Sequence, residues 1–88
     1  MTEDKKISTA LKKAKSHLEN VIQMTEAKKY CIDILQQNLA VIGLLKSANK
    51  ELLNRHLNSC FKTAALSSNE KKKRKMVEEI LKINKLIA

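Results

Sequence analysis

The sequence predicts an all-α fold, a three-helix protomer with a long central helix, from its composition and its apolar spacing. The 88 residues contain no proline and one glycine, Gly43, whereas Leu, Ile, Ala, Lys and Glu are abundant. These abundant residues favour helices. Apolar residues recur at helical intervals, and no strand or hairpin pattern is present. Because a chain of this length makes one domain at most, we expect a single helical domain over residues 1–88, with helices at about 4–27, 29–65 and 69–87.

The first helix is predicted from a heptad-like row of apolar residues. The row consists of Ile7, Leu11, Ala14, Leu18 and Val21. Such a row makes one face of a helix that packs against another helix. Lys12, Lys13 and Lys15 lie mostly off this row, and residues 27–30 are the expected turn.

The second helix carries an apolar stripe that is wider than one helix contact needs. The stripe comprises Ile32, Leu35, Leu39, Val41, Ile42, Leu44, Leu45, Leu52, Leu53, Leu57 and Phe61. Its width indicates contacts on two sides, with the first helix and with another subunit. We therefore expect the long helices of two chains to pair in an antiparallel four-helix-bundle dimer. The stretch Ser47-Ala48-Asn49 is the weakest part of this helix and an alternative break.

The third helix has a predicted start and an unusual first turn. Ser67 and Glu70 fit a capping box, and Ser68 and Asn69 are alternative N-caps. The helix then begins with five consecutive cations, Lys71-Lys72-Lys73-Arg74-Lys75. Positive charge at a helix N-terminus opposes the helix dipole, so this run is expected either to fray or to meet an anion. Apolar residues follow at Met76, Val77, Ile80, Leu81, Ile83, Leu86 and Ile87.

The charge of the chain indicates an anionic partner. Eighteen Lys and Arg stand against nine Asp and Glu, a net charge of +9. Such an excess favours DNA or RNA first and a membrane surface second. No apolar run approaches the length of a membrane span, and the N-terminus has no signal-peptide pattern. The sequence therefore predicts a cytoplasmic protein without a membrane partner. There is no Gly-rich phosphate loop and no Ser-His-Asp set, so an enzyme is not predicted.

A split set of cysteine and histidine predicts a metal site. His56 and Cys60 are four residues apart and share one face of a helix. Thiolate and imidazole suit Cu(I) or Zn(II). Cys31 lies 25 residues before His56, a span of about 37 Å along a single helix. If residues 31–56 form one helix, Cys31 cannot join His56 and Cys60 within one chain, but it could join them from a second, antiparallel copy.

Four stretches carry a family resemblance. They are Ser16–Ile22, Tyr30–Leu35, Asn54–Phe61 and Val77–Leu81. With them the chain resembles the copper-sensitive operon repressors, the CsoR group of the CsoR/RcnR metal-sensing transcriptional repressors. The resemblance covers roughly residues 7–86 and implies an all-α dimer of dimers, a homotetramer, that represses a copper-resistance operon.

The resemblance also implies roles for particular residues. Cu(I) would bind Cys31 of one protomer and His56 and Cys60 of the other. Tyr30 and Glu79 would be the outer hydrogen-bond partners, with Glu78 as an alternative to Glu79. Such partners orient a liganding imidazole.

The operator-binding face differs from the usual family pattern. Lys15-Ser16-His17 stands where the family often has Arg-Gly-Gln, and Ser47 stands where it has an operator-binding arginine. We expect Lys12, Lys13 and Lys15 to contact DNA phosphates, with Lys46 and Lys50 assisting. Residues 71–75 are the alternative surface.

The leading hypothesis is a Cu(I)-sensing repressor that leaves its operator when Cu(I) binds. One alternative keeps the fold and changes the signal to a persulfide or thiol oxidation, to another metal, or to formaldehyde. A second alternative is a copper buffer or interaction module that does not bind DNA.

Overall fold

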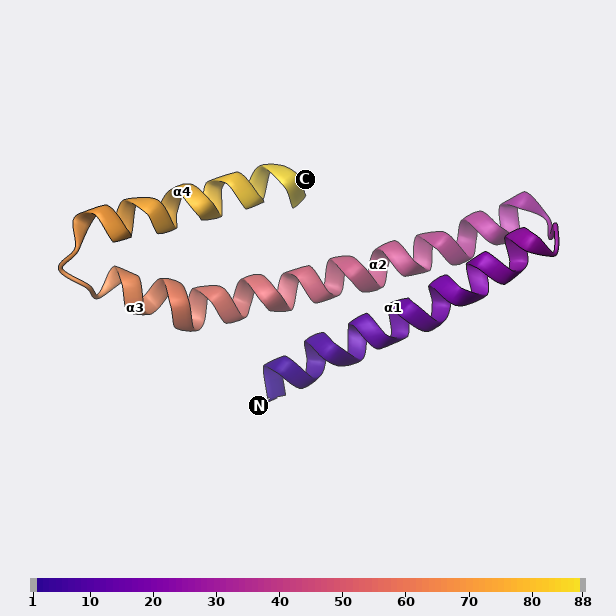
Figure 1. Ribbon diagram of the computed structural model, residues 1–88, viewed down its shortest axis with the longest axis horizontal. Helices are drawn as coiled ribbons and strands as arrows, with labels where there is room; N and C mark the ends of the chain where they lie inside the picture. The colour runs from indigo at the N-terminus through magenta and orange to yellow at the C-terminus, as the bar shows by residue number, and fades with distance from the viewer. Residues whose placement is uncertain (1, 88) are drawn as a thin grey trace. The chain divides into compact units, whose positions relative to one another are not determined.

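The computed structural model describes residues 2–87, with the side chains of residues 4–59 and 62–86. Every regular element in this part of the chain is helical, which confirms the predicted all-α class. The elements are α1 (Thr2–Glu26), α2 (Cys31–Arg55), the π-helix η1 (His56–Phe61), α3 (Lys62–Ala65) and α4 (Glu70–Ile87). The three expected helices thus correspond to α1, to α2 with η1 and α3, and to α4 (Figure 1).

The chain divides into two compact units, Met1–Leu53 and Asn54–Ala88. Unit 1 contains α1 and most of α2, and unit 2 contains η1, α3 and α4. That residues 1–88 form a single domain stays a prediction.

In unit 1, α1 and α2 form an antiparallel hairpin around the expected turn (Figure 1). The N–H of Lys28 donates to the carbonyl of Thr25 (3.1 Å), and the N–H of Lys29 donates to the carbonyl of Met24 (3.0 Å). Lys28 has a φ of 54°, so these bonds make a Schellman motif with a lysine where glycine is usual. The motif ends α1 without glycine or proline.

The core of unit 1 is small and uses every second member of the predicted row. Ile7, Ala14 and Val21 are buried, and Ala14 and Val21 cluster with Val41 of α2. Ala48 is also buried, with 1% of its surface exposed, in the middle of α2. The alternative of a break at Ser47-Ala48-Asn49 is therefore wrong, because burial of Ala48 outweighs the weak helix propensity of its neighbours.

In unit 2, a short loop joins α3 to α4, and Ala64 of α3 is buried. The side-chain Oδ1 of Asn69 accepts a hydrogen bond from the N–H of Lys72 (3.1 Å), and the Oγ of Ser67 accepts one from the N–H of Asn69 (3.1 Å). Asn69 is therefore the N-cap, one of the predicted alternatives, and Ser67 supports it instead of forming a capping box with Glu70.

Much of the predicted apolar surface is exposed in the single chain. The exposed large residues of unit 1 helices are Leu11, Leu18, Ile22, Ile32, Leu35, Leu39, Ile42, Leu45 and Leu52. Exposed apolar residues in this number are typical of an interaction site where they adjoin one another. This surface matches the second face that the sequence assigns to another subunit, but the four-helix-bundle dimer itself stays a prediction.

Candidate functional site

Cys31 lies at the N-terminal end of α2. It is the first residue of that helix, and its thiol is free and exposed. The carbonyl of Tyr30 starts the helix by accepting the N–H groups of Asp33 (3.0 Å) and Ile34 (3.2 Å). Tyr30 is 69% exposed, and the hydrogen bond that the resemblance assigns to it stays a prediction.

His56 and Cys60 lie together in η1, the π-helical segment that follows α2. His56 is its first residue and is half-buried, whereas the side chain of Cys60 lies outside the described part. The Oγ of Ser59 donates to the carbonyl of Arg55 (2.7 Å). Such side-chain bonds to the carbonyl four residues earlier often bend helices.

The π-helix is a feature that the sequence analysis missed. A continuous α-helix was expected through residue 65, yet the change of helix type coincides with the His-x-x-x-Cys motif. π-helical turns occur mostly as short insertions and frequently at functional sites. Ser59 was a sequence signal for a bend at this point, because a serine side chain can bond to the carbonyl four residues earlier.

The remaining predicted metal-site residues are spread over the two units. Tyr30 and Cys31 belong to unit 1, whereas His56, Cys60 and Glu79 belong to unit 2. Glu79 and its alternative Glu78 are exposed on α4. Within the described residues, no three His, Cys, Asp or Glu side chains gather closely enough to hold a metal ion. The ligand set thus stays a prediction.

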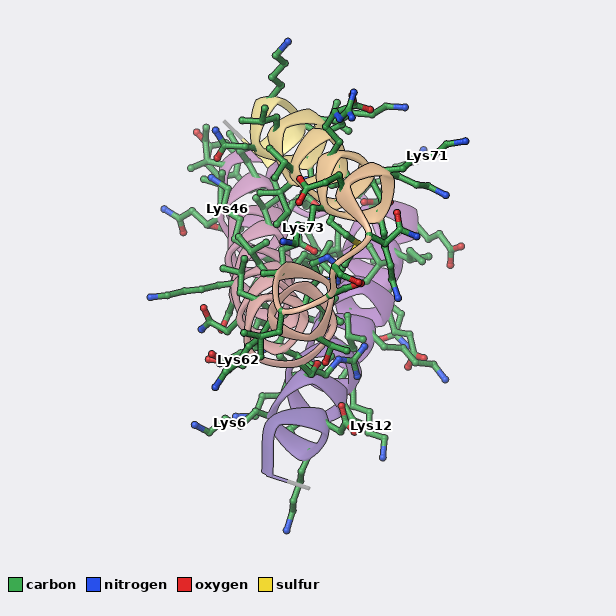
Figure 2. The ribbon with its side chains drawn as sticks, turned by 90° about the vertical axis from the view of Figure 1, so that its left-hand side faces the viewer. Lys6, Lys12, Lys46, Lys62, Lys71 and Lys73 are labelled. Carbon is green, nitrogen blue, oxygen red and sulfur yellow. The ribbon has the colours of Figure 1, made fainter. Side chains whose placement is uncertain are left out.

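The predicted DNA contacts of α1 are outside its core. Lys12, Lys13 and Lys15 are all exposed. Residues two apart on an α-helix are about 200° apart, so Lys12 lies opposite the buried Ala14. Lys12 extends outward from α1 in Figure 2. The three ammonium groups are available to an external anion.

The outer side of α2 changes from apolar to cationic along the helix. Leu39, Lys46 and Lys50 lie on the side of α2 roughly opposite the buried Val41, by the helical period, and all three are exposed. Gly43 lies between them, and a Cβ added there would have no neighbour within 4 Å. The surface around Lys46 and Lys50 is therefore open, as a DNA contact would require.

Comparison with known proteins identifies the family. The sequence model of a family described as "Metal-sensitive transcriptional repressor" matches residues 3–86. The chain belongs to this family of metal-sensitive transcriptional repressors. It is 43% identical over 56 residues to the copper-sensing transcriptional repressor CsoR of Mycobacterium ulcerans, a match that covers 64% of this chain and 48% of the relative.

Two further relatives carry similar names. The copper-sensing transcriptional repressor CsoR of Mycobacterium tuberculosis H37Rv is 41% identical over 56 residues, covering 64% of this chain and 47% of the relative. The copper-sensing transcriptional repressor RicR of the same strain is 31% identical over 77 residues, covering 88% of this chain and 80% of the relative. The chain spans about half the length of the CsoR proteins that it matches.

These relatives support the predicted class of protein. The family and the relatives are described as transcriptional repressors, which agrees with the prediction of a non-enzymatic protein. In the part of the chain that the structure describes, none of the helices combines the length and the hydropathy of a membrane span.

Proposed function

We propose that the chain is a Cu(I)-responsive repressor that binds operator DNA in the cytoplasm and releases it when Cu(I) binds. The observation that carries the proposal is Cys31, a free and exposed thiol at the start of α2, in a chain whose His-x-x-x-Cys motif occupies η1. Thiolate with imidazole is a donor set that suits Cu(I). Membership of the metal-sensitive repressor family and the names of the relatives support the same function.

The proposed metal site uses two chains. Between Cys31 and Leu53, both in unit 1, α2 is unbroken, and an α-helix rises 1.5 Å per residue, about 33 Å over this length. His56 follows three residues later. Ligands of one ion lie only a few ångströms apart, so we assign Cys31 to one protomer and His56 and Cys60 to its partner. Bound Cu(I) would link the start of α2 of one protomer to η1 of the other, and Tyr30 and Glu79 would orient the ligands.

The proposed assembly is an antiparallel homodimer that pairs into a homotetramer. The exposed apolar faces of α1 and α2 supply the surface that pairing would bury. A chain with so small a core depends on such burial, because short chains bury too little apolar surface alone. Dissociation would therefore lower the stability of the protomers as well as dismantle the metal sites.

The DNA contacts lead to a prediction about salt dependence. Replacing Lys12, Lys13 and Lys15 together by alanine should weaken binding to any duplex sequence, because each lost phosphate contact no longer releases a counterion. The slope of log affinity against log salt should flatten by up to about three units. Fluorescence anisotropy over a salt series measures both effects. Unchanged affinity and slope would place the main DNA surface elsewhere.

The direct test of the function is an anaerobic titration with Cu(I), with and without operator DNA. The apo protein should bind DNA, and Cu(I) should weaken that binding. By linkage, DNA must weaken Cu(I) binding by the same factor. Thiolate-to-copper absorption follows the metal, and anisotropy follows the DNA. Tight Cu(I) binding with no detectable DNA binding at low salt would favour a copper buffer instead.

A thiol-based sensor is a second candidate, since Cys31 is exposed and free. In that case Cys31 of one protomer would take the outer sulfur of a persulfide donor and release the donor's thiol. The Cys60 thiol of another protomer would then displace hydrosulfide, which leaves a disulfide link between the two chains. The two candidates differ at His56, because sulfur chemistry needs no imidazole. DNA release by a persulfide donor, unaffected by replacement of His56, would support the thiol sensor.

A further inference from the structure

The net positive charge of the chain is concentrated in unit 2. Residues 54–88 hold nine Lys and Arg against three Glu, a net charge of +6 of the total +9. Unit 1, with the larger number of residues, holds only the remaining +3. The DNA contacts proposed above, on α1 and α2, all belong to unit 1. The charge excess of unit 2 therefore has no role in the DNA contacts proposed for α1 and α2.

Five of these cations form one cluster, which we call the α4 basic run: Lys71, Lys72, Lys73, Arg74 and Lys75. The run is helical from its first residue. Asn69 caps the helix, as its Oδ1 accepts the N–H of Lys72 and its carbonyl accepts the N–H of Lys73 (3.1 Å each). The expectation that the run frays is thus wrong, because the Asn69 cap satisfies N–H groups at the start of the helix.

The charges of the α4 basic run are mostly not neutralised within the chain. Lys73 is half-buried and its Nζ lies 3.5 Å from Oε1 of Glu70. The other four cations are exposed, and no ion pair of theirs occurs among the side chains that the structure describes. Four like charges at the positive end of a helix dipole repel one another and the dipole. An external polyanion would relieve this repulsion.

The distribution of the run around the helix indicates what kind of polyanion fits. Consecutive residues are about 100° apart on an α-helix, so five cations encircle α4 and leave no apolar side along the run. A helix that lies on a membrane carries its apolar face along the same length as its cations, whereas the exposed apolar residues of α4 all follow the run, at Val77, Leu81, Ile83 and Leu86. Residues 62–88 also contain no aromatic side chain, and proteins that hold single strands usually stack bases on aromatic rings. Binding to the phosphate backbone of a duplex requires neither an apolar face nor aromatic rings.

We propose that the α4 basic run is a second DNA-binding surface, which holds duplex DNA through its phosphates without reading the sequence. Lys71, Lys72, Arg74 and Lys75 make these contacts, while Lys73 remains paired with Glu70. Lys71 extends outward from the helix in Figure 2. The proposal rests on the proposed DNA-binding function. It assigns part of the affinity, but none of the specificity, to unit 2.

The test compares two variants of the full chain that lose the same charge. K71Q/K72Q/R74Q/K75Q removes the four exposed cations of the run, and K5Q/K6Q/K28Q/K29Q removes four exposed cations of unit 1 outside the proposed DNA contacts. Circular dichroism and gel filtration first establish that both keep the helix content and assembly of the unmodified chain. Affinity for an operator duplex and for an unrelated duplex is then measured over a salt series.

The run variant should lose at least tenfold in affinity for both duplexes, and its salt slope should flatten by up to about 3.6 units, about 0.9 for each lost contact. The control variant should change less, because none of its four cations is assigned a phosphate contact whose loss would reduce counterion release. The ratio of the affinity for the operator duplex to that for the unrelated duplex should be the same in all three proteins. The reason is that losing a phosphate contact weakens binding to every sequence alike.

Three other outcomes would overturn the proposal, and they differ in whether the proposed repressor function is overturned with it. Equal loss in the run variant and the control leaves the repressor function intact but reduces the run to general charge. Normal DNA binding by the run variant, with loss of binding to vesicles containing phosphatidylserine, makes the partner a membrane surface. No DNA binding by the unmodified chain at low salt removes the proposed function together with the second surface.

Discussion

Replacing Cys31 by alanine is expected to lower the Cu(I) affinity by more than the roughly 10- to 100-fold that loss of an outer hydrogen-bond partner costs a metal site. The reason is that the variant loses one of the two thiolates, the ligands that select Cu(I). Competition with a Cu(I) chelator under anaerobic conditions measures the affinity. Lys29→Ala, which changes an exposed neighbour without a ligand atom for Cu(I), should bind Cu(I) like the unmodified chain.

A mixing experiment then tests whether the site belongs to two chains. Cys31→Ala and His56→Ala/Cys60→Ala each lack part of the ligand set, so neither should bind Cu(I) tightly alone. A heterodimer of the two should regain one intact site per pair. Subunit exchange is established with differently tagged chains. If the exchanged mixture recovers no tight binding, the shared site is wrong and the three residues do not form one site.

Replacing His56 by alanine is expected to leave Cu(I) binding in place while abolishing the release of DNA that Cu(I) causes. Two thiolates alone can hold Cu(I), so the affinity should stay high. The response should be lost, because we expect the imidazole at the start of η1 to convert Cu(I) binding into a movement of the helix. Coupling between two ligands is typically a factor of about 5 to 150, and in the variant this factor should approach one. Anisotropy of a labelled operator duplex with and without Cu(I) measures it.

The other histidine of the chain provides the matched control. His17 is exposed on α1, and His17→Ala should release DNA with Cu(I) as the unmodified chain does. Normal Cu(I)-driven release by the His56→Ala variant would refute the role of His56 in the response. Loss of Cu(I) binding itself in that variant would make His56 an essential ligand instead.

The helices could be predicted because apolar periodicity is a local property of the sequence. The row that includes Ile7, Ala14 and Val21 predicted α1, and the turn at residues 27–30 was placed correctly. Which members of that row a single chain buries could not be predicted. Leu11 and Leu18 share the spacing but stay largely exposed, because periodicity does not show whether a residue faces its own chain or another one.

The cap and the π-helix show two further limits of sequence reasoning. Three successive residues have side chains that can cap a helix: Ser67, Ser68 and Asn69. In the folded chain Asn69 is the N-cap, and the side chain of Ser67 accepts the N–H of Asn69. Helix propensity also does not distinguish hydrogen bonds four residues apart from those five apart. The π-helix that holds His56 therefore had to come from the structure.

The helical class, the spacing of the Cys and His residues and the charge excess are properties of the sequence alone, since each follows from the order of residues along the chain. The division of the chain into two units, the burial of Ala48 and the helical order of the α4 basic run are properties of the folded chain. These properties depend on the tertiary contacts and capping hydrogen bonds of the folded chain, and residue order alone does not specify those contacts. The concentration of charge in unit 2 became visible only once the boundary between the units was known.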